Sequence, residues 1–126
     1  MIIKPRHPPR EFEVGINQKI TLKDCGSIHL EPNEQITFAT AGGHEYDVVR
    51  KTWGFYATPS LNGRLEKFNL RAVLVKNRAD FFFLLLVEKG KEPEFQKYAD
   101  SEHLSIVCWM DNAVGLRALG QRVAPD

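Results

Sequence analysis

The stretch GGHEYDVVRKTWGFYATPSLNGR, residues 42–64, is the segment around which the rest of the chain is organised. It begins with a Gly-Gly pair and ends near the turn-forming sequence TPSLNG. In the eight residues after the glycines, the side-chain types differ between odd and even positions. Alternation with a period of two is typical of a strand, whose successive side chains point to opposite faces. The pattern predicts a strand over residues 44–51. Its two faces carry His44, Tyr46, Val48 and Arg50 on one side, and Glu45, Asp47, Val49 and Lys51 on the other.

Length and composition indicate one soluble globular domain with an ordinary core. The chain has 126 residues, 43% of them hydrophobic and 26% charged, which is usual for such a domain. The net charge of +1 gives no general argument for binding nucleic acid. Residues 1–10 differ, because they hold three basic side chains, three prolines and no acid. We therefore divide the chain into a basic, Pro-rich and partly disordered arm, residues 1–10, and a single β-rich domain, residues 11–126.

Targeting signals and cysteine spacing predict a cytoplasmic protein. The N-terminus lacks the apolar segment of a signal peptide, and the longest apolar run, residues 81–87, is too short to cross a bilayer. Cys25 and Cys108 lie far apart and outside any metal-type spacing, so we expect reduced thiols. The spacing of the four histidines does not match a metal site either. We predict no metal, no cofactor and no membrane partner.

The segments before residue 42 read as short strands. Residues 12–24 alternate around an interruption at residues 15–18. Residues 28–30 and 36–38 alternate again on either side of Glu-Pro-Asn-Glu, in which Pro and Asn suit a turn. The pattern predicts that residues 28–38 form a β-hairpin.

The segments after residue 64 predict a second hairpin and a short helix. Residues 65–76 alternate, and residues 81–87 are apolar throughout, as in a central strand that is buried on both faces. Pro93 at a helix start, followed by Phe95 and Tyr98 at helical spacing, predicts an amphipathic helix. Residues 104–110 then predict a strand, and Asp111 is a candidate cap for a last helix that runs to Leu119.

These elements together predict a mainly β protein with a small helical contribution. No helix-length segment separates the first six strands, which argues against a parallel α/β fold. The expected architecture is an antiparallel β-sandwich or a partly open barrel, with one or two short C-terminal helices.

The candidate ligand-binding residues come from residues 42–64. Aromatic faces combined with arginine forks are suited to a sugar, a sugar phosphate or another small polar, anionic ligand. Such a site would be built by His44, Tyr46, Arg50, Trp53, Tyr56, Asn62 and Arg64. The competing interpretation places the aromatic side chains in the core, with the arginines at its rim. We assign Glu45, Asp47 and Lys51 to a solvated face of the strand, and assign no catalytic residue.

Two other classes of function remain open from the sequence. The apolar strands and the basic arm suit a protein–protein interaction subunit or an oligomer-forming accessory subunit, including a homo-oligomer. Acid–base groups at His44 or Glu45 suit a cupin-like isomerase or epimerase. Nucleic acid binding is disfavoured, because acids interrupt the basic and aromatic residues of the central stretch.

Overall fold

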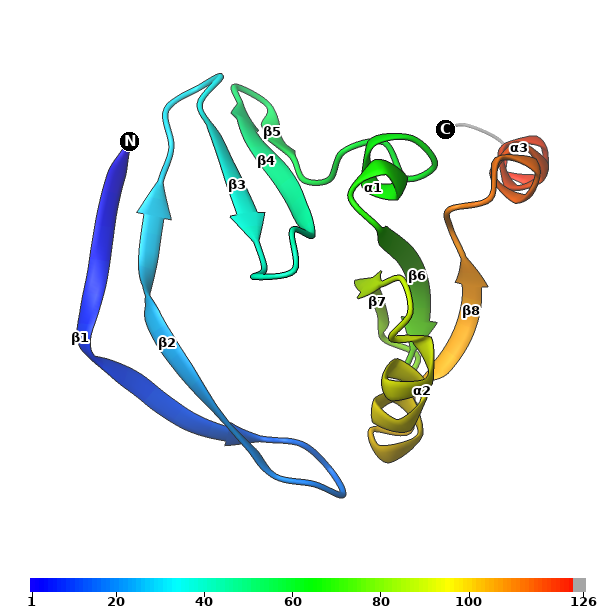
Figure 1. The fold of residues 1–126 in the computed structure, drawn as a ribbon, viewed down its shortest axis with the longest axis horizontal. Coiled ribbons are helices and arrows are strands. Elements are labelled where there is room, and N and C mark those ends of the chain that lie inside the picture. The colour runs from blue at the N-terminus through cyan, green and yellow to red at the C-terminus, as the bar shows by residue number, and fades with distance from the viewer. Residues whose placement is uncertain (124–126) are drawn as a thin grey trace.

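The computed structural model describes residues 1–123 and shows a mainly β protein. Within these residues, eight strands form three separate antiparallel sheets, and three short helices accompany them. None of the three sheets closes on itself. Figure 1 shows the sheets side by side, with a two-stranded ribbon at one end, a three-stranded sheet in the middle and the C-terminal sheet at the other end. The predicted strand-rich class and antiparallel pairing are therefore confirmed.

The N-terminal segment forms a strand and not a disordered arm. Strand β1 (Ile2–Val14) pairs antiparallel with β2 (Ile20–His29), and together they make the β1–β2 ribbon. The pairing register shifts between Pro5 and Arg10, since the prolines of that segment have no N–H to donate to a partner strand. Gly26 (φ +135°) lies opposite Pro5, where a Cβ atom would collide with the backbone of β1.

The middle sheet has the order β3–β4–β5, formed by Gln35–Ala39, Glu45–Lys51 and Gly54–Tyr56. The strand predicted over residues 44–51 is confirmed as β4. The hairpin predicted over residues 28–38 is wrong, because β2 pairs with β1 and β3 pairs with β4.

The turn predicted inside that hairpin does form, but its backbone is hydrogen-bonded to β4 and does not connect two paired strands. Asn33 adopts φ 69°, as the sequence suggested for a residue that tolerates left-handed backbone. Two backbone hydrogen bonds join this turn to β4. The Asn33 N–H donates to the Arg50 carbonyl at 2.6 Å, and the Arg50 N–H donates to the Glu34 carbonyl at 3.0 Å. These bonds to β4 replace a ladder between β2 and β3.

The C-terminal sheet has the order β7–β6–β8. Strand β6 (Leu70–Lys76) pairs antiparallel with β7 (Phe82–Glu88), which confirms the predicted pairing of these segments. Helix α2 (Glu92–Ser101) follows, and strand β8 (Ser105–Trp109) pairs with the other side of β6. The central strand is therefore β6, so the prediction that residues 81–87 are buried on both faces is wrong: β7 is an edge strand.

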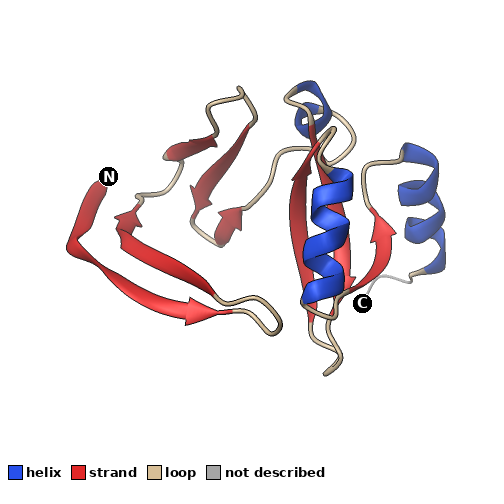
Figure 2. Ribbon diagram, turned by 60° about the horizontal axis from the view of Figure 1, so that its bottom comes forward, coloured by secondary structure: helices blue, strands red, loops and turns tan. Residues whose placement is uncertain are grey.

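The hydrophobic core consists of two small clusters, one on each face of the C-terminal sheet. Leu65, Leu70 and Ala72 form the first, with Leu65 supplied by the one-turn helix α1 (Arg64–Lys67). The second contains the buried valines of β6 and β7 and is packed by Phe95 of α2. Figure 2 shows α2 lying along this face of the sheet.

Helix α3 (Ala113–Arg122) stands apart from the sheets in both views (Figures 1 and 2). The cap is Asn112, whose side chain accepts a 3.1 Å hydrogen bond from the Gly115 N–H, and not Asp111 as predicted. Asp111 instead pairs with Arg71 at 2.7 Å. No residue of α3 is buried.

Candidate functional site

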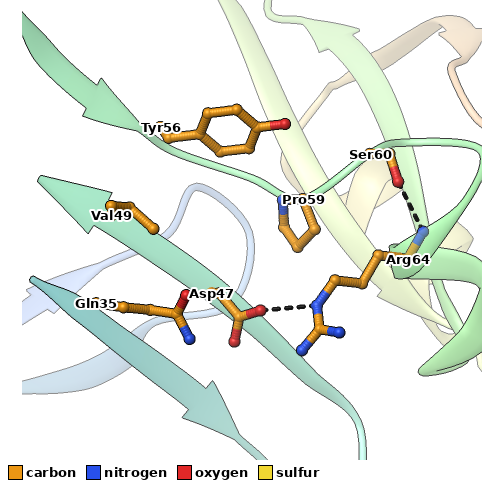
Figure 3. A pocket seen from close by; sticks show the side chains of 7 residues that line it. All are labelled: Gln35, Asp47, Val49, Tyr56, Pro59, Ser60 and Arg64. Carbon is orange, nitrogen blue, oxygen red and sulfur yellow. Dashed lines mark hydrogen bonds and ion pairs between the residues drawn. The ribbon is translucent and has the colours of Figure 1, made fainter. Parts of the chain in front are cut away.

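A polar pocket lies between strand β4 and the loop that leads into α1 (Figure 3). Its volume is about 480 Å³, within the range of small-ligand sites. Strands β3 to β5 supply one wall, and the loop before α1 supplies the other. The lining residues are Gln35, Asp47, Val49, Tyr56, Pro59, Ser60 and Arg64.

Asp47 is the buried charged residue of this pocket, only 9% exposed. It lies directly opposite Thr37 in the β3–β4 register, and the Thr37 hydroxyl donates to its Oδ1 at 2.7 Å. Arg64 donates through Nε to its Oδ2, also at 2.7 Å. The hydrogen bond from Thr37, followed by the bond and the positive charge of Arg64, outweighs burial and lowers the pKa of Asp47 below its ordinary value of 3.8.

The start of helix α1 positions Arg64. The Ser60 hydroxyl oxygen accepts a 2.8 Å hydrogen bond from the Arg64 backbone N–H, which satisfies one of the first amide donors of the helix. The guanidinium also lies 4.9 Å from the centre of the Phe68 ring. Contacts to both the backbone and the side chain of Arg64 therefore hold it in place, and its bond to Asp47 links α1 to β4.

Two of the seven predicted binding residues, Tyr56 and Arg64, line this pocket. His44 and Tyr46 lie on the opposite face of β4 and line a smaller cavity of about 190 Å³. There, Tyr46 stacks on Phe38 with 5.2 Å between ring centres, and His44 Nδ1 lies 3.4 Å from the Glu88 carboxylate.

The other three predicted residues lie outside both cavities. Arg50 donates to the Leu30 carbonyl at 2.8 Å and so holds the chain between β2 and β3. Trp53 is 71% exposed in the turn before β5, and Asn62 is exposed in the loop before α1. The structure therefore does not bring the seven side chains to one place, and their role as a single binding site stays a prediction. The isomerase alternative at His44 or Glu45 also stays a prediction.

Gln35, Asp47 and Ser60 were not among the predicted binding residues. The assignment of Asp47 to a solvated face is wrong, because Thr37 and Arg64 cover its carboxylate. The tight turn at Gly42 and Gly43 sets the β3–β4 register, so the sequence contained the information needed to place Thr37 opposite Asp47. It contained no comparable local information that Arg64 of α1 would contact Asp47.

Removing the charge of Asp47 is expected to weaken folding in a pH-dependent manner. Asp47→Asn should lower the free energy of unfolding by about 1–3 kcal/mol near neutral pH, because it leaves Arg64 without its carboxylate partner. A carboxyl group with a lowered folded-state pKa contributes fully above its unfolded pKa, and it loses that contribution as the pH falls through the folded pKa. The difference in urea unfolding between the two proteins should therefore stay near its full value down to about pH 4, and should disappear only as the pH falls through the lowered folded-state pKa. A difference that is constant with pH would contradict the assignment.

Uncovered apolar side chains form a second feature of the structure. One face of the β1–β2 ribbon carries four of them; we call this set the ribbon face: Phe12, Val14, Ile20 and Leu22. A second set lies on the C-terminal sheet, on the face opposite α2 and beyond the first core cluster, and we call it the open half-face. Its members are the exposed Phe82 and Leu84 and the half-buried Leu74 and Cys108. In general, large contiguous apolar patches on a protein surface are found at protein–protein contacts, at membrane contacts and in ligand-binding grooves.

The structure thus offers a polar pocket and two uncovered apolar surfaces. Across residues 1–123, His, Cys, Asp and Glu side chains form no group of three that would hold a metal ion. In the same range, no helix combines the length and the apolar character needed to cross a membrane. In comparisons with known proteins, the chain matches no protein-family model, no curated protein and no solved structure.

Proposed function

We propose that this chain is a subunit of a multichain assembly. The observation that carries the proposal is its accessible surface of 9241 Å². A folded monomer of 14.4 kDa exposes about 6,800 Å² by the scaling of surface with mass, so the excess is about 2,400 Å². This excess is the area that a partner would remove from water.

The size of the excess favours a permanent assembly over a transient encounter. A standard protein–protein interface buries about 800 Å² on each partner, roughly a third of the excess. Obligate assemblies bury larger and more apolar areas, similar to a domain core divided between two chains. The exposed side chains here are of that kind, and they include the ribbon face, the aromatic residues at the start of β7 and the apolar residues of α3.

The β1–β2 ribbon and helix α3 have no buried residue within residues 1–123. A two-stranded ribbon is at best marginally stable in water without further packing, and an isolated helix of ten residues is marginal as well. An assembly would supply packing to both. The sandwich or partly open barrel expected from the sequence would then be completed between chains.

The native size of the protein tests this proposal without assuming a partner. In a gently prepared cell extract, size-exclusion chromatography with antibody detection is expected to place the chain well above 14.4 kDa. Denatured extract, run on the same column in denaturant, serves as the control for an extended single chain. Elution at the position of a compact single chain would overturn the proposal.

A second candidate function is the binding of a neutral sugar in the polar pocket. The Asp47–Arg64 pair leaves the pocket without net charge, so a phosphate would meet an ionised carboxylate beside the arginine. A sugar would instead use the remaining guanidinium donors and the Ser60 hydroxyl, with Tyr56 as an apolar face.

Titration followed by amide NMR tests the sugar proposal. Neutral monosaccharides are expected to shift amide signals around Tyr56 and Ser60, and inorganic phosphate is expected to leave them in place. Tyr56→Ala should weaken the response about tenfold, by the loss of roughly 1.4 kcal/mol of ring contact. Trp53→Ala is the matched control, because it removes an exposed ring outside the pocket. Shifts by phosphate alone would contradict the proposal.

A further inference from the structure

We infer that the missing neighbour is a second copy of this chain, and that the open half-face of each copy covers the ribbon face of the other. This inference rests on the proposed assembly and names its partner. It also predicts which surfaces meet.

The ribbon face is a two-residue-wide apolar strip produced by the β1–β2 register. Phe12 lies opposite Leu22, and Val14 lies opposite Ile20, so all four side chains point the same way. Their exposed fractions are similar, from 37% for Val14 to 44% for Ile20. The other face of the same segment carries the pairs Glu11–Lys23 and Glu13–Thr21. Such alternation is typical of a sheet with one buried and one solvated face.

The open half-face is a second apolar surface, also built from paired strands. Leu74 of β6 lies opposite Leu84 of β7 and opposite Cys108 of β8, so the three side chains share one face. Phe82 lies two residues from Leu84 on the same face and is 56% exposed, while Leu84 is 44% exposed. Farther along the same face, the first core cluster is covered by Leu65 of α1. Beyond this cluster, Phe82 and Leu84 stay exposed.

Within one chain, the tip of the β1–β2 ribbon is hydrogen-bonded to helix α2, which covers the face of the C-terminal sheet opposite the open half-face. The backbone N–H of Ile16, at the ribbon tip, donates to Glu102 Oε2 at 2.9 Å, and the Asn17 side chain donates to the Ser101 carbonyl at 2.9 Å. These acceptors lie at the C-terminal end of α2, and α2 packs on the face opposite the open half-face. The open half-face is therefore left for another molecule.

Packing a ribbon face on an open half-face would form a two-layer sandwich. Two antiparallel sheets pack face to face about 10 Å apart when each presents an apolar inner face. A reciprocal exchange between two copies, related by a two-fold axis, covers both surfaces in both copies and leaves neither for a third. The excess of about 2,400 Å² on each chain exceeds the roughly 1,600 Å² that two contacts of standard size would take from one partner, so each copy has enough surplus surface for both contacts.

Charge and symmetry favour a second copy over an unrelated partner. A net charge of +1 lets two copies meet without appreciable repulsion. Most soluble oligomers are homo-oligomers with closed symmetry, and two-fold dimers are the commonest of them. This chain carries both halves of the proposed contact, so no other protein is needed to complete it.

Complementation between two variants tests the inference. Leu22→Lys places a positive charge in the ribbon face, and Leu84→Glu places a negative charge in the open half-face. Each variant alone is expected to raise the dimer dissociation constant at least about tenfold, because an unpaired charge would be buried in both contacts. An equimolar mixture should form a heterodimer, since one of its two contacts joins an intact ribbon face to an intact half-face and the other pairs the new lysine with the new glutamate. Thr21→Lys, on the solvated face of the same strand, is the control and should dimerise as the wild type does.

Sedimentation velocity on each sample gives outcomes that separate the two proposals. Restored dimer in the mixture supports the reciprocal contact, and failure to restore it overturns that contact. A wild-type chain that is monomeric alone, but large in cell extract, overturns the inference and leaves the assembly proposal standing. If either charged variant fails to fold, Leu22→Cys and Leu84→Cys chains in a Cys25→Ser, Cys108→Ala background decide the matter, because alanine keeps position 108 of the open half-face apolar. A short bismaleimide should then crosslink the mixed chains, and absence of crosslinking overturns the inference.

Discussion

Leu65→Ala is expected to lower the free energy of unfolding by about 2–5 kcal/mol, the range for removing a fully buried leucine side chain. Leu65 is 0% exposed and packs with Leu70 and Ala72 in the first core cluster. Tyr46 of β4 contacts the same cluster, so the cavity would loosen the contact between the middle sheet and the C-terminal sheet. Chemical denaturation followed by tryptophan fluorescence measures the change.

Lys67→Ala is the matched control for Leu65→Ala. It lies in the same one-turn helix but is exposed, so its effect should stay within about 0.5 kcal/mol. All variants must be compared at one protein concentration, because unfolding of an assembly depends on concentration. A loss below about 1 kcal/mol for Leu65→Ala would show that the cluster is not the core of the protein.

Arg71→Ala is expected to destabilise the C-terminal sheet by about 2–3 kcal/mol. Arg71 forms a bidentate pair with Asp111, with distances of 2.7 and 3.4 Å, and it also lies 3.4 Å from Glu92 at the start of α2. Its guanidinium lies 4.0 Å from the Trp109 ring centre. Removing it leaves two carboxylates without their partner, although its 26% exposure keeps the cost below the 3–5 kcal/mol of a fully buried pair.

Arg71→Lys separates the geometry of this contact from its charge. Lysine keeps the positive charge but loses the planar fork and the stacking on Trp109, so it should recover only part of the stability. Thermal unfolding reports on both variants when it is monitored by tryptophan fluorescence in a Trp53→Phe background, in which Trp109 is the single tryptophan. Full recovery by lysine would show that charge alone stabilises the junction of β6, α2 and the loop after β8.

Local sequence patterns predicted the individual elements well, because the information for them lies within a few residues. The alternation in residues 44–51 predicted β4, and Pro93 with the helical spacing after it predicted α2. The apolar residues on both sides of Asn77–Asp80 predicted the β6–β7 pair. In each case, side-chain periodicity or a turn residue determines the local backbone.

Partners that are distant in sequence were not predictable in the same way. Residues 28–38 contain parts of two strands and a turn, as predicted, but β2 pairs with β1 and β3 pairs with β4. Local sequence patterns do not determine which strand becomes the hydrogen-bonding partner of another. The prolines of residues 1–10 suggested disorder, but a register shift lets this segment pair with β2. Residues 81–87 suggested a buried central strand, because an apolar run looks the same in the sequence of a central strand and of an edge strand.

The candidate site shows the same limit. The sequence identified Tyr56 and Arg64, which the fold brings to one pocket, but it grouped them with His44 and Tyr46 from the other face of β4. Asp47 was assigned to the solvated face because its partner Arg64 is 17 residues away and reaches it only through the loop before α1.

Sedimentation equilibrium of the purified chain tests the central claim most directly. We expect a mass of twice 14.4 kDa at micromolar concentration, because the reciprocal contact closes with two copies. A single species of 14.4 kDa that persists as the concentration rises would contradict the claim that a second copy covers these apolar faces.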